Sequence, residues 1–101
     1  MFISRRCPPA LTYQHKILYV GRDHDLFKFL QDRLAAWDCY VDYCPSLWLA
    51  YLFLKSKTDF ALCVFDELPE ATGAKLEQFA RALPHRAGTP MIVVSSVREV
   101  R

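Results

Sequence analysis

The sequence has little glycine and no paired cysteines. Only three glycines occur in 101 residues, and they stand apart, so no glycine-rich loop is present to bind a phosphate. None of the four cysteines forms a CxxC pair or lies at zinc-finger spacing from a histidine. A zinc site is therefore not expected. Three of the cysteines fall in or beside apolar segments, where free thiols act as small hydrophobic side chains, as in a reducing cytoplasm: Cys39, Cys44 and Cys63.

Long apolar runs and a strong charge bias are also absent. The longest apolar run, from Leu47 to Leu54, is far shorter than the roughly 20 residues that span a bilayer. Arg5 and Arg6 are followed by Cys-Pro-Pro instead of the apolar stretch of a secretory signal. The formal charge of +2 favours neither a nucleic acid nor a membrane as partner. We expect a soluble, cytoplasmic protein.

The composition is that of a folded protein. Hydrophobic residues make up 52% of the chain, and 101 residues suffice for one domain with one core. Residues 1–15 show no sustained period and contain two consecutive prolines, which predicts a loose leader. The domain is expected over residues 16–101.

Four strand-like segments alternate with three helix-like ones. Strands are predicted over residues 16–20, 39–44, 60–65 and 91–94, and helices over residues 25–37, 46–57 and 72–83. Asp23 or Asp25 and then Ser46 are the expected amino-terminal caps of the first two helices. This alternation predicts an α/β fold of flavodoxin-like type, with a parallel sheet in the order 2-1-3-4 and helices on both faces.

Polar residues follow three of the predicted strands. In such a sheet, the carboxyl ends of the first and third strands open into one crevice, where binding and reaction sites lie. Asp66 follows the third strand and is the first candidate for chemistry. The residues expected to meet it in the crevice are Gly21, Arg22 and Asp23 after the first strand and Ser95 after the fourth.

The order of these features over residues 16–96 resembles the receiver domain of bacterial two-component response regulators. The matching pieces are the strand 17–20 with an acidic stretch after it, Asp66, Leu68 and Pro69, Gly73, and Ser95. The resemblance implies that Asp66 accepts a phosphoryl group from a histidine kinase and that Ser95 is the switch hydroxyl that bonds to it. It also implies Mg²⁺ held by Asp66 and an acidic pair after the first strand.

The sequence departs from this pattern at several points. Gly21 and Arg22 stand where the acidic pair is expected, and Asp23 comes one residue later. Because Mg²⁺ needs oxygen ligands, we expect its binding by Asp23 and Asp66 to be weak or absent, and Arg22 could pair with Asp66 instead. Pro69 follows Asp66 by three residues instead of four, which a one-residue deletion in the loop explains.

The family's fifth strand, with its lysine, would follow the last residue, Arg101. We therefore interpret the chain as a truncated, degenerate receiver that acts through protein contacts and has no enzymatic activity. The alternative is a phosphorylatable receiver in which Asp23 assists Asp66. A third interpretation is that Asp66 only ends a strand and bonds nearby backbone amides.

Two apolar surfaces are candidates for contact. The strand from Met91 to Val94 would be an uncovered sheet edge, which predicts self-association or docking of another protein. The second helix is apolar nearly all round, so Trp48, Tyr51 and Phe53 form a second candidate patch unless the leader covers them.

Two other classes of function remain open. In a small hydrolase, Asp66 would be the nucleophile, but no evident general base accompanies it, and His24 alone is predicted near the crevice. Nucleic-acid binding would depend on a loose basic cluster that lacks interleaved aromatic residues and is expected to be a solvated face. Its members are Arg81, His85, Arg86, Arg98 and Arg101.

Overall fold

The computed structural model describes residues 15–94, so the predicted leader up to residue 14 and Ser95 lie outside the described residues. Strands and helices alternate along this part of the chain, as predicted. The elements are β2 (His15–Val20), α1 (His24–Ala35), β3 (Cys39–Cys44), α2 (Leu47–Lys55), β4 (Phe60–Phe65), α3 (Gly73–Arg81), the short 3-10 helix η2 (Pro84–Arg86) and β5 (Met91–Val93).

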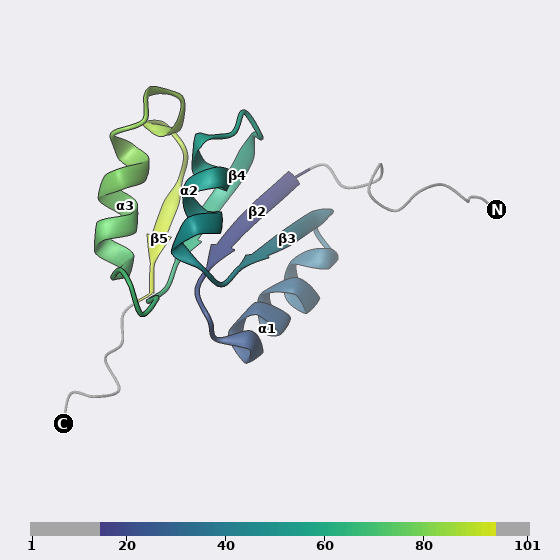
Figure 1. The fold of residues 1–101 in the computed structure, drawn as a ribbon. Helices are drawn as coiled ribbons and strands as arrows, with labels where there is room; N and C mark the ends of the chain where they lie inside the picture. The colour runs from purple at the N-terminus through teal and green to yellow at the C-terminus, as the bar shows by residue number, and fades with distance from the viewer. Residues whose placement is uncertain (1–14, 95–101) are drawn as a thin grey trace.

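The four strands form one parallel sheet in the order β3-β2-β4-β5 (Figure 1). Counted along the described chain, this is the predicted order 2-1-3-4, with the first and third strands in the centre. The carboxyl ends of β2 and β4 therefore lie side by side, and β3 and β5 are the two edges. The prediction of a flavodoxin-like sheet is confirmed.

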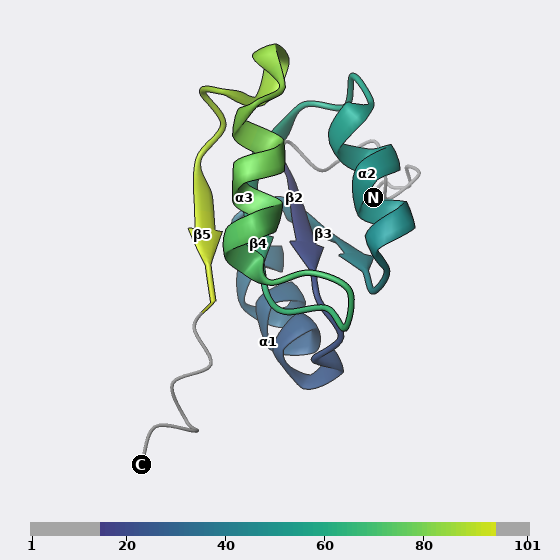
Figure 2. The same ribbon diagram turned by 60° about the vertical axis from the view of Figure 1, so that its left-hand side comes forward.

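The alternation of side chains along the strands builds two apolar layers. Leu18, Val20 and Phe65 point to the face that α2 and α3 cover. Ile17, Tyr19 and their neighbours point to the opposite face, which α1 covers. Figures 1 and 2 show the sheet between these two layers of helices. Successive strand residues alternate between the faces, so both layers draw on the same central strands.

Three polar side chains begin the three helices. The side chains of Asp23, Ser46 and Thr72 each accept a hydrogen bond from a backbone amide three residues later. The first helix ends at Ala35, earlier than predicted. The amide of Trp37 bonds back to Leu34, and Asp38 takes the left-handed conformation with φ 60°, which turns the chain into β3.

The predicted contact patch on α2 is partly wrong. Tyr51 and Phe53 are half-buried, because their rings pack against Phe79 and Phe60. The helix instead exposes an apolar stripe on its other side, consisting of Trp48, Leu49 and Leu52, with Trp48 70% exposed. The position of this stripe follows from helical spacing, since residues 48 and 52 are one turn apart.

The edge strand β5 has two exposed apolar side chains, Ile92 and Val93, and Ile92 is the more exposed of the two. Ile92 lies beside Val64 in the sheet and points to the α1 face, yet it is 51% exposed. The reason is that α1 packs mainly against β3, at the other edge. Within residues 15–94, no helix combines the length and apolar character needed to cross a membrane.

Candidate functional site

Asp66 lies at the carboxyl end of β4, beside the end of β2. Its amide donates a 2.7 Å hydrogen bond to the carbonyl of Val20, which fixes the two strand ends next to each other. Phe65, the residue before it, is fully buried in the α2 and α3 layer. Because successive side chains of a strand point to opposite faces, the carboxylate of Asp66 points to the face of the sheet that α1 covers.

The partner of this carboxylate is a tyrosine that the sequence analysis did not select. The hydroxyl of Tyr19 donates to Oδ2 of Asp66 at 2.9 Å and accepts a 3.1 Å bond from the amide of Asp23. The other oxygen, Oδ1, accepts from the amide of Glu67 at 2.8 Å. Both carboxylate oxygens are thus bonded by groups of the same chain.

The environment keeps the phenol of Tyr19 protonated. Its side chain is fully buried, and this burial raises the pKa of Tyr19 well above the ordinary value, with the hydrogen bond to Asp66 raising it further. A neutral phenol is a hydrogen-bond donor, whereas a phenolate would repel the carboxylate. The Tyr19 to Asp66 bond is therefore a stable feature of the site at physiological pH.

Gly21 leaves the space that Tyr19 and Asp66 occupy. A Cβ atom at this position would lie 2.6 Å from Cβ of Asp66 and 2.6 Å from the Tyr19 hydroxyl oxygen, closer than real Cβ contacts. The structure therefore brings Gly21 into the crevice next to Asp66. It also shows why no acidic side chain can stand here with the Tyr19 hydroxyl in place.

The two polar residues after Gly21 are engaged elsewhere or exposed. The carboxylate of Asp23 accepts the 3.0 Å bond from the amide of Leu26 that begins α1. Arg22 is exposed and forms no ion pair within residues 15–94, so the expected pairing with Asp66 is wrong. The reason is that the Tyr19 hydroxyl and the Glu67 amide already supply the donors that Arg22 would have supplied.

These residues do not fit a magnesium ion. The position of the expected acid is a glycine with no free space, the nearest alternative carboxylate caps a helix, and the oxygens of Asp66 already accept hydrogen bonds. In the described part of the chain, no three side chains of His, Cys, Asp or Glu are grouped as metal ligands would be. The cation ligand set implied by the resemblance is not reproduced.

His24 contributes packing beside the crevice. Its ring lies 5.8 Å from that of Phe27 and 5.5 Å from that of Tyr43, the latter edge-on. Tyr43 in turn stacks on Tyr19 at 6.1 Å between ring centroids. The ring contacts of His24 are thus with the aromatic group that supports Tyr19.

The described cysteines behave as predicted from the sequence. Cys39, Cys44 and Cys63 are buried and free. Burial raises the pKa of the Cys44 thiol and of the Cys63 thiol to about 11 each, so both stay protonated. Their side chains are part of the buried core.

Of the loose basic cluster, Arg81 and His85 are exposed as expected and Arg98 and Arg101 lie outside the described residues, but the expectation of a solvated side chain is wrong for Arg86. Arg86 is 2% exposed and donates from Nε and Nη2 to the carbonyls of Phe53, Leu54 and Ser56, at 2.9 to 3.1 Å. Its guanidinium also lies 4.9 Å from the ring centre of Phe60. Arg86 therefore binds the carboxyl end of α2, where the last carbonyls have no helical amide four residues later to accept from. Sequence spacing alone did not reveal this contact over 30 residues.

Comparison with known proteins supports the fold. No family model matches the sequence, and no curated protein matches it either. The structure is similar to that of the non-phosphorylated HemR receiver domain from Leptospira biflexa, with a TM-score of 0.64 and 25% sequence identity. The match covers 77% of this chain and 61% of that one, so this chain spans about three fifths of its length. The chain has a receiver-like fold.

Proposed function

We propose that the chain is a receiver-like module of two-component signalling that acts through protein contacts, with its phosphoryl chemistry lost. The likeness to a receiver domain supports the signalling class. The partners proposed are proteins of the same signalling class, a histidine kinase among them. The alternative is a phosphorylatable receiver in which Asp66 is the phosphoacceptor.

One observation carries the proposal: the Tyr19 hydroxyl bonds directly to the carboxylate that would be phosphorylated. The hydrogen bonds from Tyr19 and from the Glu67 amide lower the nucleophilicity of the carboxylate, and Asp66 would have to attack without a nearby cation to neutralise the incoming phosphate. Neither Gly21 nor Arg22 supplies a carboxylate for such a cation. Asp66 consequently serves to hold the ends of β2 and β4 together.

The test is incubation of the full chain with acetyl phosphate and Mg²⁺, followed by intact-mass measurement. We expect no increase in mass. A gain of one phosphoryl group that disappears in Asp66→Ala would establish the phosphorylatable alternative instead. Asp42→Ala is the matched control. Asp42 is an aspartate on the edge strand β3 that pairs with Lys16 at 3.5 Å and is not part of the crevice, so this substitution should leave any phosphorylation of Asp66 unchanged.

The proposed contact surface includes the edge strand β5. Its outer backbone groups face no further strand in the described part of the chain, and Ile92 adds an exposed apolar side chain. We propose that two copies associate along the segment from Met91 to Val94. Light scattering after size exclusion at tens of micromolar should give a dimer that Ile92→Lys weakens. A monomer at every concentration would contradict this part.

A further inference from the structure

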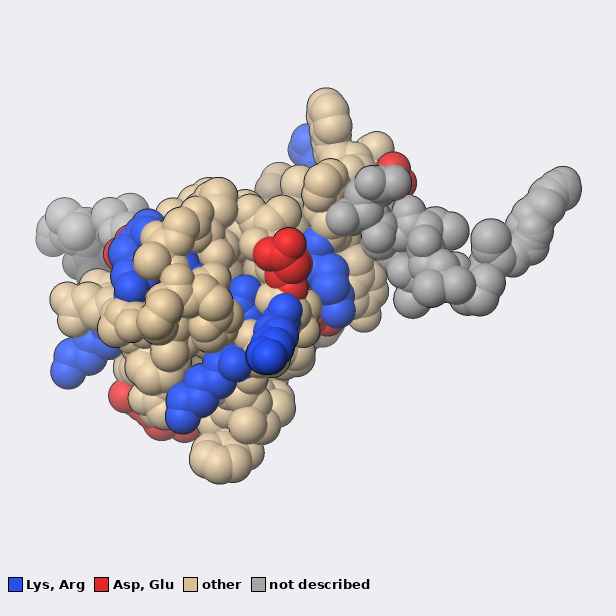
Figure 3. Space-filling view, turned by 90° about the horizontal axis from the view of Figure 1, so that it is seen from above, with Lys and Arg blue, Asp and Glu red and all other residues tan. Residues whose placement is uncertain are grey.

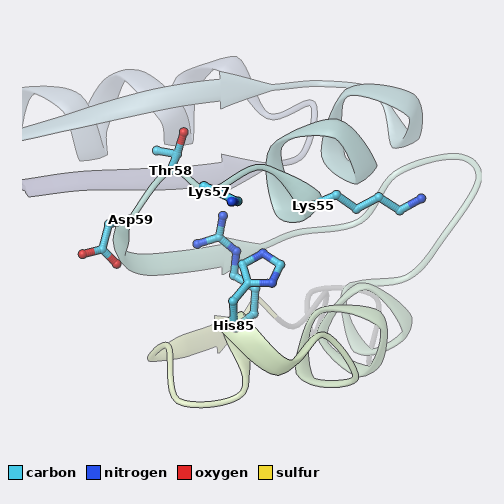
Figure 4. Close-up of a pocket in the computed structure, with 6 residues that line it drawn as sticks. Lys55, Lys57, Thr58, Asp59 and His85 are labelled. Atoms are coloured by element: carbon cyan, nitrogen blue, oxygen red, sulfur yellow. The ribbon is translucent and has the colours of Figure 1, made fainter.

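A second charged region lies at the opposite end of β4 from Asp66. A pocket of about 380 Å³ opens where α2 leads into β4, and η2 closes its other side (Figure 4). Figure 3 looks down on this end of the molecule and shows lysine and arginine side chains close to a small acidic patch. The pocket is lined by Lys55, Lys57, Thr58, Asp59, His85 and Arg86.

Positive charge in this pocket is not balanced. Lys55, Lys57 and Arg86 carry three charges against the one of Asp59. None of these four side chains forms an ion pair with any residue between 15 and 94. In Figure 4, Lys55 and Asp59 extend away from the pocket, whereas the ring of His85 lies beside it; Lys57 is a further lining residue. The pocket therefore presents cations without a counter-charge.

Arg86 has one nitrogen left to bind a ligand. Its Nε and Nη2 are held by three carbonyls of the α2 end, which fixes the guanidinium plane. The remaining nitrogen, Nη1, donates no hydrogen bond to any described residue, although the side chain is almost entirely buried. A guanidinium that is already held in place and has a free N–H donor suits an oxyanion, because little side-chain entropy is lost when the anion binds.

His85 is held in the same way. Its Nε2 lies 3.0 Å from the carbonyl of Leu54 and 3.1 Å from that of Ser56. Because both partners are acceptors, we assign the proton to Nε2, so Nδ1 is the nitrogen left without a carbonyl partner.

We propose that this pocket binds an oxyanion of the phosphate class, free or on a small molecule, through Nη1 of Arg86 and the ammonium of Lys57. A multiply charged anion fits better than a single carboxylate, since at least two cations face the pocket and its volume exceeds that of a carboxylate. The site is distinct from the Asp66 crevice and does not rest on the proposed signalling role.

The experiment is an NMR titration of the ¹⁵N-labelled full chain with inorganic pyrophosphate, with ionic strength held constant by chloride. We expect saturable shifts at the amides of Lys57, His85 and Arg86 and at Nε of Arg86. Lys57→Gln should raise the Kd about fivefold, as expected for one partly screened charge-assisted bond. Lys28→Gln is the matched control, because Lys28 is an exposed lysine on α1.

The control variant Lys28→Gln should leave the Kd for pyrophosphate unchanged. Lys57 is exposed and makes no ion pair with a described residue, so its substitution leaves the fold intact. Shifts that fail to saturate in the millimolar range, or that chloride alone reproduces, would overturn the proposal. An equal Kd for Lys57→Gln and the unsubstituted chain would overturn it as well.

Discussion

A charged side chain lies at each end of β4: Asp66 at the carboxyl end, and Arg86 of η2 at the amino end. The two side chains differ in how many of their polar atoms form hydrogen bonds within the chain. At the carboxyl end, both oxygens of Asp66 accept hydrogen bonds from nearby groups of the chain. At the amino end, two of the three guanidinium nitrogens of Arg86 donate to carbonyls at the end of α2, and the third, Nη1, bonds to no described residue. The carboxylate of Asp66 is thus bonded within the chain, whereas Arg86 has one nitrogen with no partner among the described residues, which is the basis of the proposed anion site.

The largest effect should come from removing the buried arginine. Arg86→Met removes three charge-assisted hydrogen bonds to carbonyls at the end of α2 and removes the guanidinium from the Phe60 ring, which should lower the free energy of unfolding by about 3 kcal/mol. Urea unfolding measures this value. Arg81→Met is the control, because Arg81 is exposed and pairs with Glu77, a contact expected to contribute below about 1 kcal/mol. Equal losses for both variants would mean that Arg86 does not hold α2.

Gly21 offers the next largest effect, at the crevice end. The added methyl group of Gly21→Ala would overlap Cβ of Asp66 and the Tyr19 hydroxyl, so one of them must move, at a cost of about 2 kcal/mol. Gly88→Ala provides the comparison, because a Cβ at Gly88 meets no atom within 4 Å. The difference between their thermal midpoints measures how tightly the crevice is filled. If Gly21→Ala were as stable as Gly88→Ala, the crevice would have free space.

Loss of the phenol hydroxyl should have a smaller effect. Tyr19→Phe removes one donor from the half-buried Asp66, while the Glu67 amide still serves Oδ1, so we expect a loss of about 1 kcal/mol. Tyr51→Phe is the matched control, because the Tyr51 hydroxyl bonds to no described residue and its ring packs on Phe79 in both forms. Indistinguishable stabilities of the two variants in urea would show that the Tyr19 hydroxyl contributes nothing.

The last effect lies outside the physiological range and is a progressive loss of stability at alkaline pH. The folded chain raises the pKa of Cys44 and of Cys63 from 9.0 to about 11, and raises that of Tyr19 above its ordinary value of 10.0. A raised pKa means that stability is complete below the unfolded value and is lost as the pH rises toward the folded one. The urea midpoint should therefore fall above pH 9. Tyr19→Phe should flatten the part of this decline above pH 10, and an identical decline would contradict the assignment to Tyr19.

The sheet could be predicted from the sequence because local signals agreed. The second and third predicted strands match β3 and β4 to the residue, since an alternating segment of β-forming residues ends at Pro45 and an apolar run ends at Asp66. Ser46 caps α2 as expected, because a serine before an apolar helical segment is a local signal. Strand ends and helix caps depend on residues that are close together in the sequence, so the sequence alone is enough to predict them.

The partners across the sheet could not be predicted in the same way. Tyr19 reads as one more core residue of an apolar strand, and its hydroxyl meets Asp66 only because β2 and β4 are adjacent. A usable signal was present nonetheless. Tyr19 and Gly21 are two residues apart, so they lie on the same face of the sheet. Because Gly21 has no side chain, the long side chain of Tyr19 can extend over it toward the end of the strand. Arg86 carried no such signal, because its carbonyl partners lie on another helix.

The most direct test of the central claim is a titration with beryllium fluoride and Mg²⁺, followed at the amides of Gly21 and Glu67 by NMR. Beryllium fluoride mimics a phosphoryl group on an aspartate that can hold Mg²⁺ beside it. Because Tyr19 and the Glu67 amide occupy the oxygens of Asp66, we predict that both resonances stay unchanged. A saturable shift of both, absent in Asp66→Ala, would show that the crevice opens to a phosphoryl group and would contradict this account.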